Sequence, residues 1–308
     1  MTTSLITFEN QIHEWLLDLL HSQWRLLGVP FSTSRSPRPH EVIDPEALLW
    51  CSLEFFPSEP RLREQVLAWL AGNDKCLLRP RIRKFARGQS DPRSNIWNVL
   101  DPQWKSNVIE PTQPCYGQKS VAQLLQFCRD LADKPNPAAT LRQKPGLRQR
   151  TDATVLLRAR DALGSDAKHF LLVYLLANPG GAKLRSIATW SGQSYRNIFN
   201  AASRWEVAHI VSIEHGYCRL KNPAPWEDIL ELESNQILLL DWARFYDTSI
   251  QLLQALNKAQ AALIPADSPV IATILREAVV EIEANVLGNA PAPCQTALDL
   301  KNLLTNQL

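Results

Sequence analysis

The side chains best suited to chemistry gather in one stretch of the sequence, residues 194–204. Hydroxyl, amide and guanidinium groups recur there at the spacing of one helix face. Arginine contacts guanine edges or phosphates, asparagine contacts adenine, and tyrosine and serine contact phosphates. The stretch therefore predicts a surface that fits a nucleic-acid groove, and its members are Ser194, Tyr195, Arg196, Asn197, Asn200 and Arg204.

Two predicted helices and the turn between them must position this surface. The turn needs a residue that tolerates a positive φ, and Gly192 meets that need. The helix before the turn needs a small residue where it crosses its partner, which predicts Ala188 at the crossing. The helix after the turn needs an early apolar residue facing the core, which predicts Ile198 there. Further core-facing side chains are expected at Ile187, Phe199 and Ala202.

A hairpin is predicted directly after the second of these helices. β-branched and aromatic residues at 210–213 and 217–220 flank a Glu-His-Gly turn. Another helix is predicted before the pair, with Asp166 as its cap and a Pro-Gly-Gly stop at 179–181. Almost no other segment has a strand pattern, so the predicted fold class is mainly α with one small β-hairpin.

This succession of helices, turn and hairpin resembles the winged helix-turn-helix family of bacterial transcription regulators. The resemblance covers about residues 153–222, and the matching residues before the hairpin are Leu184, Ile187, Ala188, Gly192, Ile198 and Ala201. It implies that the third helix enters the major groove of duplex DNA. It also implies that the hairpin, or wing, contacts the adjacent backbone or minor groove through His215, Tyr217, Arg219 and Lys221.

Cations elsewhere would strengthen a salt-dependent attraction for phosphates. We expect such contacts from Arg148 and Arg150, with Arg142 and Lys144 beside them in a basic linker. Arg158 and Arg160 are further candidates. A second basic stretch at 75–87 is interleaved with apolar residues, which fits another nucleic-acid or partner surface or a solvated helix face.

Helix patterns account for most of the remaining chain. Apolar residues near a 3.6-residue period predict a helix at 4–27, and Asp44 followed by Pro45 predicts the start of a second. A third is predicted from Pro60 to a stop at Gly72-Asn73. The other predicted helices cover 120–133, 235–263, 268–288 and the segment from 294 onward.

Composition and charge predict several domains. A helical domain is expected at 1–133, a basic Pro-containing linker at 134–152, the resembling unit at 153–222, and an acidic helical domain for packing or dimerisation at 223–308. Residues 1–226 hold 29 Lys and Arg against 20 Asp and Glu, whereas residues 227–308 hold 4 against 11. This asymmetry fits a nucleic-acid-facing part and a separate packing part, and simple surface variation is the other interpretation.

No set of side chains converges on catalysis or on a metal. The six histidines are scattered, and phosphate-loop, dinucleotide, zinc-protease and serine-hydrolase motifs do not occur. Asp44 and Glu46 form a carboxylate pair, but the capping and dipole of the helix that they begin explain both. We therefore expect no enzymatic activity, no cofactor and no bound metal.

The sequence also predicts a cytoplasmic protein. The six cysteines are widely spaced without a CxxC pair, which indicates reduced thiols. The N-terminal residues carry acidic side chains and no basic segment before an apolar core, so no signal peptide is predicted. No apolar run approaches the roughly 20 residues that span a bilayer.

Two functions remain open at this stage. The first is a DNA-binding transcriptional regulator that reads duplex DNA, for which an antitoxin-like or autoregulatory role would be one form. Such regulators usually pair two readers, so a homodimer through the C-terminal helices is expected with it. The alternative is a helical interaction or scaffold protein that uses a winged-helix fold to bind a protein partner.

Overall fold

Helices make up most of the residues that this computed structural model describes. The structure describes residues 5–35, 38–56, 58–73, 76–78, 80–82, 151–233, 237–284, 286–287 and 294–305. The predicted helix at 120–133 and the linker cations, including Arg148 and Arg150, lie outside the described residues. The sheets within the described ranges are small and antiparallel.

The N-terminal helices follow their sequence signals closely. Helix α1 covers Leu5–Leu26, α2 covers Pro45–Phe55 and α3 covers Pro60–Asn73. Asp44 is the N-cap of α2, and its carboxylate accepts a hydrogen bond from the Ala47 amide at 3.1 Å. Proline at the first helical position suits this start because its missing N–H would have no partner there. These helix predictions are confirmed.

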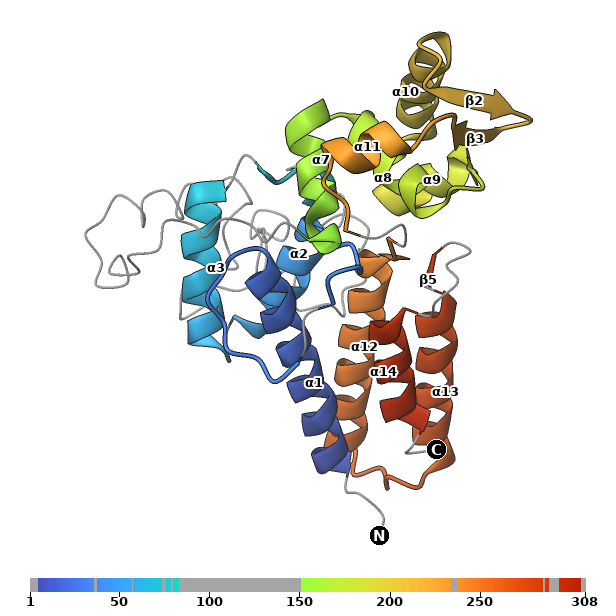
Figure 1. The fold of residues 1–308 in the computed structure, drawn as a ribbon. Coiled ribbons are helices and arrows are strands. Elements are labelled where there is room, and N and C mark those ends of the chain that lie inside the picture. The colour runs from blue at the N-terminus through green and yellow to red at the C-terminus, as the bar shows by residue number, and fades with distance from the viewer. Residues whose placement is uncertain are drawn as a thin grey trace, which may run out of the picture.

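The C-terminal helices α12 (Trp242–Ala261), α13 (Pro269–Ala284) and α14 (Gln295–Thr305) pack beside them. Helix α12 lies against α1, α2 and α13 (Figure 1), and one hydrophobic core contains buried side chains from all of these elements. Trp242, Phe245 and Leu256 are almost fully enclosed in it. The apolar surplus of the C-terminal helices therefore packs in a core that α12 shares with the N-terminal helices.

Both long C-terminal helices are shorter than their sequence patterns predicted. Strands β4 (Leu239–Leu240) and β5 (Val286–Leu287) pair antiparallel, so 235–263 is wrong as a helix at its start and 268–288 at its end. Asp241 marks the change, because its carboxylate accepts the Arg244 amide and caps α12. A strand of two residues is too short for periodicity to distinguish it from a helix.

A second hydrophobic core lies in the central part of the chain. It is built mainly by α7 (Val155–Leu163), α8 (Ala167–Ala177), α9 (Leu184–Ser191) and α10 (Tyr195–Val207), with strands β2 (Val211–Glu214) and β3 (Tyr217–Leu220). A 3-10 turn, η5 (Asp152–Thr154), precedes them and α11 (Ala224–Ile229) follows. In Figure 1 this unit occupies one end of the molecule, and α12, α13 and α14 extend to the other.

The central sheet has the strand order β1-β3-β2, and every pairing is antiparallel. Strands β2 and β3 form the predicted hairpin, with Ser212 opposite Arg219. Strand β1 (Ala182–Lys183) pairs Ala182 with Cys218 and was not predicted. Residues 167–220 therefore form three helices, α8, α9 and α10, and the three-stranded sheet in one continuous stretch.

We expect Leu256→Ala to destabilise the shared core by about 2–5 kcal/mol, because it leaves a cavity in a fully buried site of α12. Leu263→Ala is the matched control, since that leucine is 89% exposed and its loss should change stability by less than about 0.5 kcal/mol. Urea unfolding of both variants measures the difference. Equal effects would contradict the assignment of α12 to this core.

Candidate nucleic-acid interface

The turn between α9 and α10 has the backbone that its sequence predicts. Gly192 ends α9 with φ 66° in the left-handed region, where glycine is favoured, and its amide donates to the Thr189 carbonyl. Ser194 caps α10, because its hydroxyl accepts the Asn197 amide at 3.1 Å. The turn thereby fixes where the first residues of α10 project.

One face of α10 is buried and the rest is exposed. Ile198, Ala201, Ala202 and Trp205 pack into the second core, at the spacing of a single helix stripe. All the residues of the predicted groove-facing surface lie outside this stripe and are exposed: Ser194, Tyr195, Arg196, Asn197, Asn200 and Arg204. The side chains that could contact a nucleic acid are thus not needed by the core.

The prediction that Phe199 faces the core is wrong. Its side chain is 44% exposed, and its ring stacks on that of Tyr195 with centroids 6.1 Å apart. Phe199 follows Ile198 directly, so it is turned by about 100° from the buried stripe. The other residues expected on the core side, Ile187, Ala188 and Ala202, are buried.

The β2–β3 hairpin carries the second group of predicted contact residues. A two-residue turn joins the strands, with positive φ at His215 (51°) and Gly216 (80°), which is the type I′ geometry that suits a twisted hairpin. Side chains of β3 alternate between the core and solvent. The exposed side chains from the turn onward are His215, Tyr217, Arg219 and Lys221. These residues therefore form a second exposed edge beside α10.

A shallow groove of about 390 Å³ runs between the start of α8 and one flank of α10. Asn197, Asn200 and Arg204 line one wall, so three of the predicted contact residues meet there. Asp166 and Lys168 line the other, where the Asp166 carboxylate caps α8 and pairs with the Lys168 ammonium at 2.9 Å. The groove holds hydrogen-bond donors from two elements and one carboxylate.

Two arginines that were expected to help bind DNA have structural roles instead. The Arg158 guanidinium donates to the carbonyls of Leu230 and Thr151. Arg160 is 4% exposed and pairs with Glu46 of α2 at 2.7 Å. Their carbonyl and carboxylate partners lie far along the chain or in the preceding turn, so sequence spacing does not reveal them.

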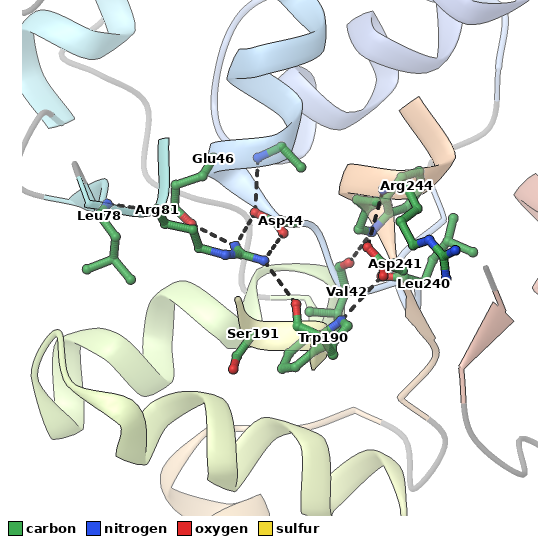
Figure 2. A network of polar contacts seen from close by, with 12 residues as sticks. Val42, Asp44, Glu46, Leu78, Arg81, Trp190, Ser191, Leu240, Asp241 and Arg244 are labelled. Carbon is green, nitrogen blue, oxygen red and sulfur yellow. Dashed lines mark hydrogen bonds and ion pairs between the residues drawn. The ribbon is translucent and has the colours of Figure 1, made fainter. Parts of the chain in front are cut away.

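Arg160 belongs to a buried ionic cluster formed by Asp44, Glu46, Arg81 and Arg160. Arg81 is a member of the basic stretch at 75–87, yet it is 4% exposed and contacts both carboxylates, at 2.5 Å for Asp44 and 3.0 Å for Glu46. It also donates to the Trp190 carbonyl of α9, as Figure 2 shows. The described part of this stretch therefore supplies an internal ion pair at Arg81.

Glu46 is the most enclosed member of the ionic cluster. Its side chain is 0% exposed, and besides both arginines it accepts the Leu78 amide at 2.8 Å. Burial raises the pKa of the Glu46 carboxyl, but Arg160, Arg81 and the Leu78 amide outweigh burial, so its net pKa lies below the ordinary value. The sequence explained Glu46 by its place at the start of a helix. The structure adds a larger role, because Glu46 of α2 pairs with Arg160 of α7 and so links the two hydrophobic cores.

His169 lies close to the ionic cluster and is fully buried. Its Nδ1 lies 3.1 Å from the Gly164 carbonyl, and within the described chain its Nε2 has no hydrogen-bond partner. Burial and the nearby Arg160 charge lower the pKa of His169 from 6.5 to about 3. The ring is therefore neutral in the folded protein and serves packing, with Phe170 beside it.

We expect Glu46→Gln to cost about 3–5 kcal/mol of unfolding free energy, because it leaves two buried arginines without their shared carboxylate. Glu277→Gln on the exposed surface of α13 is the control, with an expected change below about 0.5 kcal/mol. Chemical denaturation measures both. A loss no larger than that of the control would show that the cluster does not hold the two cores together.

His169 predicts a defined pH dependence. Its folded pKa is about 3 against 6.5 unfolded, so below pH 6.5 the unfolded state binds a proton that the folded state excludes. As the pH is lowered below 6.5, this group should therefore reduce the free energy of unfolding by up to about 1.4 kcal/mol per pH unit. His169→Phe should flatten that slope in urea unfolding series run from neutral pH into mild acid. Parallel slopes for variant and wild type would refute this account.

The described residues offer no cluster of metal ligands. They contain no group of three His, Cys, Asp or Glu side chains placed to hold a metal ion. Burial raises the pKa of the Cys218 thiol to about 12, which leaves it unreactive.

No helix in the described ranges is both long and apolar enough to cross a membrane. Comparison of the chain with protein-family models, curated proteins and solved structures gave no match.

Proposed function

We propose that the protein is a DNA-binding transcriptional regulator, in which α8, β1, α9, α10, β2 and β3 form a winged helix-turn-helix unit. Helix α10 would enter the major groove of duplex DNA, and the β2–β3 hairpin would be the wing. The helix order and the left-handed Gly192 support this, since both agree with the resemblance drawn from the sequence.

One observation carries the proposal. All the residues predicted for the groove-facing surface and for the wing are exposed, on or next to α10 and the hairpin, while Ile198, Ala201 and Trp205 of α10 fill the core. Both elements project at one end of the molecule, away from α12, α13 and α14 (Figure 1). A polar helix face of this kind, presented from a rigid core, suits a groove reader.

The charges nearby fit a phosphate backbone. Arg196, Arg204, Arg219 and Lys221 are all exposed cations of this unit. The one carboxylate in the last turns of α10, Glu206, accepts the Ile213 amide of β2 at 3.1 Å. The few cations of one unit would bind DNA weakly, which favours two units acting together.

A homodimer through the C-terminal helices would supply the second unit. Most apolar side chains of α12 and α13 pack inside the shared core, but Val270 and Val280 of α13 are at least half exposed. We propose the exposed side of α13 that carries Val270 and Val280 as the dimer contact. An antitoxin-like or autoregulatory role is one form that such a regulator could take.

The second candidate function is protein binding by the same unit. Exposed apolar side chains favour it, namely Tyr195, Phe199, Val207 and Tyr217. Surfaces of this kind also occur at protein interfaces, where aromatic residues are enriched. The two functions differ in their response to salt, because only the first depends on the release of counterions from DNA.

We expect the full chain to bind random duplex DNA with an affinity that falls steeply between about 50 and 200 mM salt. Arg196→Ala and Arg204→Ala should each weaken binding and reduce the slope of log affinity against log salt by about 0.9 per lost phosphate contact. Fluorescence anisotropy over a salt series measures both quantities.

The matched control is Arg61→Ala, which removes an exposed cation from α3, outside the proposed DNA and dimer contacts. Its affinity and salt slope should equal those of the wild type. Absence of binding even at the lowest salt would reject the DNA-binding function and favour the protein-binding one.

A further inference from the structure

Tyr195 and Phe199 form an exposed aromatic pair on α10. They lie one turn apart, their rings stack with an interplanar angle of 25°, and they are 50% and 44% exposed. The core does not use them, because the buried stripe of α10 consists of other residues. Two large rings therefore remain in contact with water at the face that the proposed function turns toward DNA.

The neighbours of the pair are polar and suit base edges. Arg196 and Asn200 each follow one of the two rings in the chain and share the exposed surface of α10. In the proposed complex, the first turns of this helix would face the base edges of the major groove. Polar edges would satisfy Arg196 and Asn200, but the aromatic rings need an apolar partner to gain from leaving water.

Only one base supplies such a partner in the major groove. Thymine presents its C5-methyl group there, whereas cytosine has only a hydrogen at C5 and the purine edges present mainly hydrogen-bond donors and acceptors. Phe199 has no polar atom on its side chain, so the thymine methyl is the feature of the groove that it can recognise. The Tyr195 ring stacks on the Phe199 ring and so covers one side of it.

We propose that Phe199, positioned by Tyr195, is a specificity-determining residue that reads the C5-methyl group of thymine. This inference rests on the proposed DNA-binding function and adds a base preference to it. The preferred site contains a thymine at a defined position, next to bases that Arg196 and Asn200 contact. Its methyl group, rather than its hydrogen-bonding edge, determines the preference.

The experiment begins by selecting preferred duplexes from a random pool with the full chain. Each thymine of the selected site is then replaced singly by deoxyuridine, which removes only the methyl group. Wild-type binding should weaken about fourfold at one position, as expected for one buried methyl. Phe199→Ala should bind the thymine and deoxyuridine duplexes equally, and Phe199→Leu should keep part of the difference.

Val207→Ala is the control for loss of an apolar side chain from the same helix, since Val207 is 82% exposed and lies in the last turn. It should keep the full deoxyuridine effect. Selective binding without any deoxyuridine effect, or with an equal effect in Phe199→Ala, would overturn this inference alone. No binding to any duplex would overturn the proposed function and this inference together. Circular dichroism confirms that each variant is folded.

Discussion

The buried Glu46 carboxylate is the interaction on which the rest of the structure depends. A charge in an apolar interior is unstable unless opposite charges and hydrogen bonds surround it. Glu46 meets that requirement with Arg81 and the Leu78 amide from one segment of the chain and with Arg160 from another. Because moving either arginine away would leave buried charge poorly compensated, α2, α7 and residues 76–78 and 80–82 are held in one arrangement.

That arrangement also holds the α7–α10 unit against the N-terminal and C-terminal helices. Arg81 reaches the Trp190 carbonyl at the end of α9, and the Trp190 indole donates to the Leu240 carbonyl just before α12. The backbone adds to this, since the Ile43 amide donates to the Ala153 carbonyl and Val42 to Leu238. The end of α9 is thus anchored, and the exposed surfaces of α10 and the β2–β3 hairpin begin from a fixed point.

Local chemistry made much of the fold predictable. Caps such as Asp44, Asp166 and Ser194 mark helix starts, and the left-handed Gly192 marks the turn, because each acts on residues next to it. The hairpin was predictable for the same reason. The packing of the C-terminal helices against the N-terminal ones was not readable from local signals, since their shared core joins residues at opposite ends of the sequence.

The candidate site shows the same limit. The exposed face of α10 follows from helix periodicity, but Phe199 lies beside the buried stripe and not in it, which an apolar residue type does not reveal. Arg160 is another example, because its partner Glu46 is 114 positions away. An arginine that binds a phosphate and one that completes a buried ion pair have the same local sequence signals. Only packing separates them.

The most direct test of the central claim maps the surface that meets DNA. The full chain would be photo-crosslinked to a duplex containing 5-bromodeoxyuridine, and the modified residues would be identified by mass spectrometry. The account predicts crosslinks within 194–204 and 211–221, on α10 and the hairpin. Crosslinks confined to other parts of the chain, at DNA concentrations that saturate binding, would contradict it.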